Sequence, residues 1–414
     1  MLPVPEVADG REPDRVPAPG RSAACGEPVT VAVAGVEFGW GSSGKLSAVL
    51  SALRERSPSP LRFVGLASRL GRPVLAGHGI HRWYDLPDGG TVEDIVASER
   101  VRAAVVVLDG PAATALEGAG VPTVFVDSLP FMWSEGDRST LPLDVTAYCA
   151  QQCLELPPEC RDVLASVRAL RWVEAVIGTP PVTGAADPSP DRPYRRALIS
   201  LGGLRAPRLT DWSAYPTVVV PAALGALAAH GVREAHVAGN LPADLAGQLI
   251  GRTNGELRVT AGALSHGEFL AGLADFDVLL ASPGLTTLLE AGSLRVPTVC
   301  LPPQNLSQIF NGRFHSRAVD ADVRVVWPKD VFCEDEALAL RSRGEDEALD
   351  LIYGGIGSAG ADAVASLQEG IVTALLTSRK VTDWGALTAG VGAGGAAQVA
   401  DALLAILGQG PPPA

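Results

Sequence analysis

Residues 279–312 read LLASPGLTTLLEAGSLRVPTVCLPPQNLSQIFNG, and this segment contains the pattern that decides the fold class. The run 277–281 predicts a short strand, and the apolar run 297–301 predicts a second one. Between them, Ser282-Pro283 predicts a helix start, because serine is a good N-cap and proline tolerates the first helical position. The helix is expected to end at Gly292. A strand, a helix and a strand within about thirty residues are typical of a βαβ unit, so the sequence predicts an α/β fold.

Polar side chains stand near the ends of both predicted strands, and in open α/β sheets ligands bind at this edge. The predicted helix N-terminus offers unpaired backbone N–H groups, which suit a phosphate. Glu290 lies one turn after Thr286, where a carboxylate can accept hydrogen bonds from two ribose hydroxyls. The amides after the second strand both donate and accept, as sugar hydroxyls require. The candidate residues of this unit for binding a diphosphate, a ribose and a sugar are Gly284, Leu285, Thr286, Glu290, Gln304, Asn305 and Gln308.

An ordinary crossover helix with a solvated loop is the alternative interpretation of any one of these residues, whereas their combination favours a nucleotide-sugar site. The run resembles the donor-nucleotide half of GT-B glycosyltransferases, especially the GlcNAc transferase that makes lipid II. The shared order is a small residue, glycine, an aliphatic residue and threonine, a helix with glutamate, and a Gln-rich loop after an apolar strand. The resemblance implies that Thr286 faces a phosphate, that Glu290 holds the ribose, and that Gln304, Asn305 and Gln308 hold the donor sugar.

Length and composition agree with an enzyme of several domains that binds small molecules. The chain has 414 residues, of which 47% are hydrophobic and 19% charged, so it can bury sizeable cores. Its net charge of −13 argues against broad binding to nucleic acid or to anionic membranes. The six cysteines lack paired CxxC spacing, which predicts reduced thiols and a cytoplasmic location. We expect no membrane span, metal or cofactor, with a UDP-sugar as substrate, and we leave a homodimer open.

A glycine-rich loop, 37–45, follows the apolar strand predicted at 29–35 and precedes a helix predicted at 46–56. The loop nearly matches a phosphate-binding P-loop, but Leu46 stands where a hydroxyl must bind magnesium, which disfavours ATP or GTP hydrolysis. It resembles the first loop of a GT-B N-terminal domain, in which many relatives carry a histidine. This chain has no histidine there, and Trp40 is the nearest substitute. The candidate acceptor-site residues of this loop are Gly39, Trp40, Gly41, Ser42, Ser43 and Lys45.

Candidate bases follow predicted strands of the N-terminal half. The runs 103–108 and 121–126 end at Asp109 and Asp127, which would place carboxylates at the catalytic edge. Both could instead cap the next helix. With Glu37 of the first loop they form three unranked candidates. The aromatic residues Phe131 and Trp133 could wall an acceptor pocket or pack in the core.

The C-terminal half begins after a proline-rich linker. Residues 151–175 are read as helix, 176–194 as the linker, and 197–201 as a strand that enters Gly202-Gly203. This strand and glycine loop resemble those that open the second domain of GT-B enzymes, which implies that Gly202 and Gly203 lie near the donor diphosphate. Arg205 and Arg208 could neutralise a phosphate or a sugar carboxylate, and the resemblance places Leu264 near the nucleotide base. Another strand is expected at 323–327.

The predicted architecture is GT-B, with two Rossmann-like domains facing across a cleft. The expected segments are a disordered leader (1–27), an acceptor domain (28–175), a linker (176–194), a UDP-sugar donor domain (195–355), and C-terminal helices that pack back on the first domain before a loose tail (356–414). The predicted activity is glycosyl transfer from a UDP-sugar to a small acceptor with inversion.

A narrower resemblance concerns three separate runs of the sequence. AVAGVEFGWGSSGKLSAVL, VDSLPFMW and the run SPGLTTLLEA with LPPQNLSQ resemble the cytosylglucuronate synthases of nucleoside antibiotic pathways and their related proteins. This resemblance implies UDP-glucuronate as donor and cytosine as acceptor. A UDP-sugar 2-epimerase and a non-catalytic sugar-nucleotide-binding protein are the alternatives.

Overall fold

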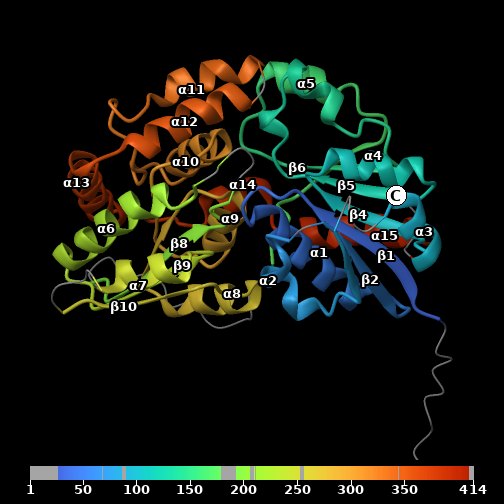
Figure 1. The fold of residues 1–414 in the computed structure, drawn as a ribbon, viewed down its shortest axis with the longest axis horizontal. Coiled ribbons are helices and arrows are strands. Elements are labelled where there is room, and N and C mark those ends of the chain that lie inside the picture. Colours follow the sequence, from blue (N-terminus) through green and yellow to red (C-terminus); the bar gives the residue numbers. More distant parts are fainter. Residues whose placement is uncertain are drawn as a thin grey trace, which may run out of the picture.

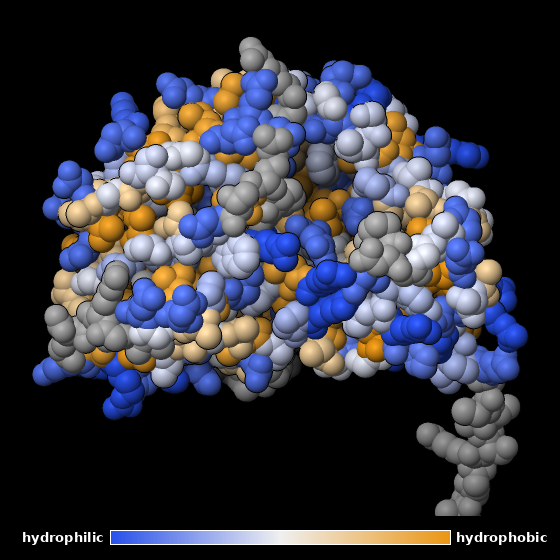
Figure 2. Space-filling view, in the orientation of Figure 1, coloured by the Kyte–Doolittle hydropathy of each residue, from blue (hydrophilic) through white to orange (hydrophobic). Residues whose placement is uncertain are grey.

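The computed structural model describes residues 27–67, 69–85, 90–178, 193–205, 209, 211–251, 256–343 and 345–409. Within these ranges the chain forms two lobes, each built around a parallel sheet (Figure 1). Residues 1–26 of the predicted leader, 179–192 of the predicted linker, and Arg208 lie outside the described residues. Figure 2 shows hydrophilic and hydrophobic residues interspersed over one face of the molecule.

The first sheet has seven strands in the order β3-β2-β1-β4-β5-β6-β7, all paired in parallel. Its central strands are apolar along their length and buried, as expected for a parallel sheet covered on both faces. The strands are β1 (Val29–Gly35), β2 (Leu61–Leu66), β3 (Arg82–Tyr84), β4 (Ala103–Val107), β5 (Thr123–Asp127), β6 (Ala147–Gln151) and β7 (Leu170–Val173).

Helices cover both faces of this sheet. One face packs against α1 and the C-terminal helix α15, and the other against α3 and α4. The helices of this domain are α1 (Gly41–Arg56), α2 (Arg72–Leu75), η1 (Ala76–His78), α3 (Val92–Glu99), α4 (Gly110–Gly118), η2 (Pro130–Met132), η3 (Glu135–Thr140) and α5 (Pro158–Leu164).

The second sheet has five parallel strands in the order β10-β9-β8-β11-β12. These are β8 (Arg196–Gly202), β9 (Glu234–Gly239), β10 (Arg258–Gly262), β11 (Val278–Ala281) and β12 (Thr298–Cys300). The helices around it are α6 (Ala214–Ala229), α7 (Ala243–Gly251), α8 (His266–Asp275), α9 (Leu285–Ser293), α10 (Leu306–Ala318), α11 (Glu334–Leu340), η4 (Arg341–Arg343), α12 (Asp346–Ser358) and α13 (Ala361–Ser378). In both sheets the strand order reverses beside the first strand, between β1 and β4 and between β8 and β11, and ligands of open α/β sheets bind at such points.

The last helices return the chain to the first domain. α13 packs on α6, α14 (Ala386–Val391) packs on α9, and α15 (Gly395–Ile406) packs on α1 in the other lobe (Figure 1). The segment Ala386–Ile406 is long and apolar enough by composition to cross a membrane, as core helices of globular proteins often are. It forms two helices separated at Gly392, whose φ is +73°, and the apolar face of α15 lies in the core of the first domain.

Residues 41–45, which the sequence predicted as loop, form the first turn of α1. Two longer stretches also differ from the predicted secondary structure. Residues 151–175 are not one helix, because only α5 is helical there and β7 adds to the edge of the sheet beside β6. Proline at the start of α5 fixes its beginning, and strand pairing takes the residues after it. No strand forms at 323–327, where Arg324 makes only an isolated bridge with Cys300.

The return of α15 depends on a glycine that lies against backbone of the first domain. A Cβ atom on Gly395 would lie 2.0 Å from the carbonyl oxygen of Glu174, so α15 would have to move away. We expect Gly395→Ala to lower the free energy of unfolding by about 1–3 kcal/mol in urea titrations. Gly118→Ala at the end of α4, where nothing lies within 4 Å of the new methyl, is the control and should be neutral or stabilising. Equal effects of the two substitutions would contradict this role of Gly395.

Candidate functional site

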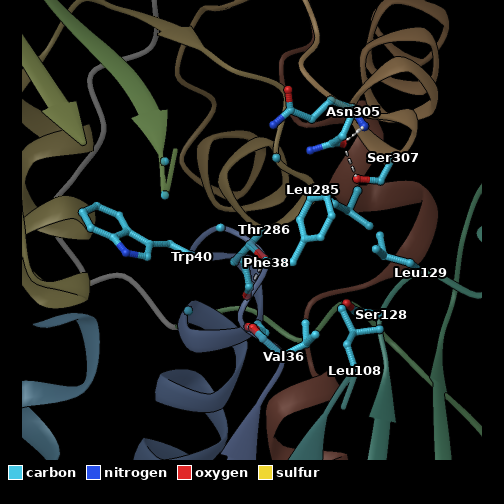
Figure 3. A pocket seen from close by; sticks show the side chains of 18 of the residues that line it. Val36, Phe38, Trp40, Leu108, Ser128, Leu129, Leu285, Thr286, Asn305 and Ser307 are labelled. Carbon is cyan, nitrogen blue, oxygen red and sulfur yellow. Dashed lines mark hydrogen bonds between the residues drawn. The ribbon is translucent and has the colours of Figure 1, made fainter. Parts of the chain in front are cut away.

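A cavity of about 410 Å³ lies between the two domains. It is lined by the residues that follow β1, β4 and β5 of the first sheet and β8, β11 and β12 of the second. In Figure 3, Val36, Leu108 and Ser128 lie on one side and Asn305 and Ser307 on the other, with Phe38, Leu285 and Thr286 close together between them. The carboxyl ends of parallel strands from both domains therefore face the same space, and its volume is in the range of small-ligand pockets.

Two glycine-containing loops from the two domains meet beside this cavity. The N–H of Gly39 donates to the carbonyl oxygen of Arg205 at 3.1 Å. A Cβ atom on Gly203 would lie 2.6 Å from the carbonyl carbon of Gly39, so the contact is backbone against backbone. Glycine is required at such a close approach.

The N-termini of α1 and α9 also meet at the cavity. Their N-cap residues are Trp40 and Gly284, and neither provides a side-chain hydrogen bond to the first turn. The hydroxyl of Thr286 donates to the carbonyl oxygen of Gly41 at 3.3 Å, which joins the two first turns. The first amide N–H groups of a helix have no partner within it, and its N-terminus carries partial positive charge. Two positive helix ends in contact favour a bound anion between them.

The helix start differs from the predicted one in a way that matters for the site. α9 begins at Leu285 and not at Ser282, so the predicted serine cap is wrong. The hydroxyl of Ser282 instead donates to Oε1 of Gln308 at 3.1 Å and accepts from Nε2 of Gln304 at 2.8 Å. Because Ser282 is engaged there and glycine is the N-cap residue, the first turn of α9 has no side-chain cap.

The amide-rich loop after β12 lines the cavity on the side of the second domain. Asn305 caps α10, since its Oδ1 accepts from the N–H of Gln308 at 3.0 Å and from the hydroxyl of Ser307 at 2.9 Å. Asn311 also lines the cavity, and its Nδ2 donates to the carbonyl oxygen of Pro283 at 3.0 Å. Its Oδ1 is buried and has no hydrogen-bond partner among the described residues, so it can accept a hydrogen bond from a hydroxyl group of a ligand.

Glu290 lines the cavity although only 1% of it is exposed. Its Oε1 lies 2.7 Å from Nε2 of His266 and accepts from the N–H of Gly178 at 3.2 Å. Lys45 is also buried and lines the cavity, with its ammonium 2.8 Å from Oε1 of Gln151 and 3.2 Å from the carbonyl oxygen of Val176. Burial lowers the pKa of Lys45 to about 7, against the opposing effect of Glu290.

The structure brings nearly all predicted binding residues together. Arg205 lines the cavity with its guanidinium 5.9 Å from the ring centre of Trp212. Ser43 is buried but is not among the described lining residues, and Phe131 packs against Phe310 and Phe314 in the core. The predicted residues that do line the cavity are Gly39, Trp40, Gly41, Ser42, Lys45, Trp133, Gly202, Gly203, Arg205, Leu264, Gly284, Leu285, Thr286, Glu290, Gln304, Asn305 and Gln308.

The three predicted bases are placed differently, and none is among the described residues that line the cavity. Asp127 is fully buried, and its carboxylate accepts from the indole of Trp133 at 2.7 Å, the hydroxyl of Tyr148 at 2.8 Å and the N–H of Leu129 at 3.0 Å. Asp109 caps α4 by accepting from the N–H of Ala112 at 3.0 Å, which is the alternative use that the sequence left open. Exposed Glu37 accepts from the N–H of Arg69.

Other carboxylates occupy the cavity instead. Asp137 of η3 comes from the first domain, and Glu345 precedes α12 of the second. Burial, followed by the carboxylates of Asp137 and Asp346, raises the pKa of Glu345 to about 7. Tyr353 lies in the same wall, and its buried hydroxyl has no partner within the described ranges. No local sequence signal marks these residues, because only the tertiary fold brings α12 to the cavity.

The buried carboxyl of Asp127 yields a test of its structural role. Burial raises the pKa of Asp127 to about 6, against the hydrogen bonds from Trp133, Tyr148 and Leu129. The native carboxyl therefore holds its proton more tightly than the unfolded one, so its contribution to stability falls as the pH rises from about 4 to about 6. Relative to wild type, Asp127→Asn should gain up to about 3 kcal/mol between pH 4 and pH 7 in urea unfolding. A stability difference that does not change with pH would contradict this account.

No family model and no curated protein sequence matches the chain. Among solved structures, S. aureus MnaA with UDP matches at 12% identity and a TM-score of 0.51, over 92% of this chain and 97% of that one. Arabidopsis thaliana UGT89C1 with UDP-L-rhamnose matches at 14% identity and 0.48, over 85% and 100%. Acinetobacter baumannii MurG matches at 13% identity and 0.43, over 84% and 100%. The likeness to MnaA, together with the two parallel sheets, confirms the predicted fold class. The chain has a GT-B-like α/β fold of two Rossmann-like domains.

Proposed function

We propose that this chain is a glycosyltransferase that moves a sugar from a UDP-sugar to a small acceptor with inversion. The observation that carries the proposal is the meeting of two helix N-termini without side-chain caps, α1 and α9, at the cavity between the domains. A diphosphate supplies the anion that this arrangement favours. It is also the leaving group of the reaction, so the same positive ends stabilise the charge that develops during transfer.

The remaining walls accommodate the other parts of the two substrates. The nucleoside lies toward Glu290, Leu264 and Phe269, and the donor sugar lies toward the amide loop and the unpaired Oδ1 of Asn311. The acceptor lies toward the first domain, against Trp133 and its apolar neighbours. Arg205 adds a positive charge at the edge of the cavity.

Glu345 is our candidate for the base that removes the acceptor proton. It lines the cavity, and a carboxyl with a pKa of about 7 is well matched to proton transfer near neutral pH. Asp137 from the other domain interacts with it electrostatically, so the two domains together set its proton affinity. This choice replaces Glu37, Asp109 and Asp127 as candidate bases.

The narrower proposal is glucuronyl transfer from UDP-glucuronate to cytosine, which rests on the resemblance of the sequence. A flat base suits the aromatic and apolar residues Phe38, Met132 and Trp133, and a donor carboxylate suits Arg205. A UDP-sugar 2-epimerase is the second candidate, because Asp137 and Glu345 could flank one sugar from the two domains.

Incubation of the protein with a panel of UDP-sugars, with and without cytosine, separates these candidates. Transfer predicts release of UDP that depends on the acceptor. Epimerisation predicts isomerisation of the sugar without an acceptor. A thermal shift with UDP-sugars but no turnover in either case would indicate a binding protein and overturn both enzymatic proposals.

Gly284 allows a direct test of the diphosphate site. Its φ is −69°, and a Cβ atom there would lie 3.8 Å or more from its neighbours, so a side chain fits. Asp and Asn both cap helix N-termini well, but only Asp adds a negative charge beside the diphosphate. We expect Gly284→Asp to bind UDP at least about tenfold more weakly than Gly284→Asn in calorimetric titrations, with both variants folded. Equal affinities of the two variants would place the diphosphate elsewhere.

The pH dependence of transfer tests the base. Glu345→Gln should lower kcat by a factor of about 10²–10⁴ and remove the rise of the rate through pH 7. Asp137→Asn removes a neighbouring negative charge, so that rise should move to lower pH. Glu336→Gln, on the exposed face of α11, is the control and should leave the rate unchanged. A Glu345→Gln enzyme with the wild-type pH profile would exclude Glu345 as the base.

A further inference from the structure

A chain of hydrogen bonds crosses from the first domain to Glu290 in the second. His78 of η1 lies with its Nε2 2.7 Å from the hydroxyl of Ser47 on α1. The same hydroxyl lies 2.9 Å from Nδ1 of His266, the first residue of α8. Nε2 of His266 lies 2.7 Å from the carboxylate of Glu290 on α9. The boundary between the domains falls between Ser47 and His266, so the Ser47 hydroxyl carries this chain of hydrogen bonds from one domain to the other.

We propose that Ser47 of the first domain positions Glu290 of the second domain through His266, so that the nucleoside site is complete only when the domains are closed. This inference rests on the proposed function, in which Glu290 binds the ribose. Ser47 and His78 are absent from the residues that line the cavity, whereas His266 and Glu290 are present. Ser47 is therefore a positioning residue: it contacts Nδ1 of His266, while Nε2 of the same ring contacts Glu290.

The donors and acceptors of this chain can be assigned from burial. Burial lowers the pKa of His78 to about 4, with smaller contributions from Arg54 and His266, so the ring is neutral at pH 7. Its Nδ1 is buried and has no partner in the part of the chain that the structure describes. A proton on that nitrogen would be a buried donor without an acceptor, so we assign the proton to Nε2.

The rest of the chain follows from that assignment. Nε2 of His78 donates to Ser47. Although burial opposes it, the carboxylate of Glu290 raises the pKa of His266. In the protonated ring Nε2 donates to Glu290 and Nδ1 donates to the Ser47 hydroxyl, whereas in the neutral ring with its proton on Nε2 the hydroxyl donates to Nδ1. A hydroxyl at position 47 can bond to both histidines in either form, because it both accepts and donates.

The surroundings of Glu290 explain why loss of a hydrogen bond to the His266 ring would disturb the position of its carboxylate. Apart from His266, its Oε1 accepts from the N–H of Gly178, at the point where the first domain leads into the linker. A Cβ atom on Gly178 would lie 2.7 Å from Leu270 and 2.9 Å from His266, so this backbone is packed against the ring. Without Ser47, Nδ1 of the ring loses its hydrogen-bond partner, and that loss acts only in the closed arrangement.

The coupling is tested by UDP binding to a double-mutant cycle, measured by calorimetry with the full chain. Ser47→Ala should weaken UDP binding by about tenfold or more, in the range of ordinary coupling between sites. In a His266→Gln background, Ser47→Ala should have no further effect, because its influence passes through the histidine. Ser51→Ala, the same change one turn later on the exposed side of α1, is the matched control and should bind UDP as wild type does.

Small-angle X-ray scattering with saturating UDP gives a second readout. We expect the Ser47→Ala chain to have a larger radius of gyration than wild type, with an unchanged circular dichroism spectrum. This inference alone would be overturned if the Ser47→Ala chain bound UDP with wild-type affinity. It would also be overturned if Ser47→Ala weakened UDP binding equally in the wild-type and the His266→Gln background. A wild-type protein that does not bind UDP would instead overturn the proposed function on which it rests.

Discussion

The contact between the first turns of α1 and α9 is the constraint around which the site is organised. Gly41 and Thr286 hold two helix N-termini together without a side-chain cap on either. Like partial charges in contact are unfavourable, and each helix end leaves amide N–H groups without partners. Each helix begins at the switch point of its own sheet, so strand order and helix direction together place both positive ends at one cavity. A bound polyanion would neutralise the partial positive charge of both helix ends and also accept hydrogen bonds from their amide N–H groups.

The polar residues near this contact are engaged in ways that preserve it. Ser282, which could have capped α9, is bound to Gln304 and Gln308. Asn305 caps α10 instead, so the amide loop is fixed by its own hydrogen bonds before any ligand arrives. Pre-organisation of this kind reduces the entropy lost on binding. Hydrogen bonds therefore hold the loop while α9 has no side-chain cap, an arrangement that would suit the proposed donor, which has a charged and a neutral end.

The sequence predicted correctly that the residues of the βαβ unit line the cavity, whereas none of its three candidate bases lines it, for physical reasons. Thr286, Glu290 and Gln304 lie on one short βαβ unit, so local spacing fixes where they stand relative to one another. An aspartate after a strand is ambiguous, because capping and catalysis both use it there, and Asp109 proved to be a cap. Glu345 reaches the cavity only through the packing of α12, far along the chain, and no local pattern encodes that contact.

In the proposed reaction, closure of the cleft would link these observations to turnover. Gly39 and Gly203 meet backbone to backbone, and the cavity beside them lies between the domains. A sugar nucleotide that binds on both helix ends must contact both domains, so its entry requires these loops to separate and its binding draws them together again. The hydroxyl of Ser47 lies on the same boundary and reaches Glu290 through His266. If closure completes the nucleoside site through this contact, as proposed, the affinity of the protein for the leaving nucleotide depends on how the domains are arranged. In the proposed mechanism, opening would then weaken the hold on the spent nucleotide, and steps of this kind limit many enzymes with closing domains.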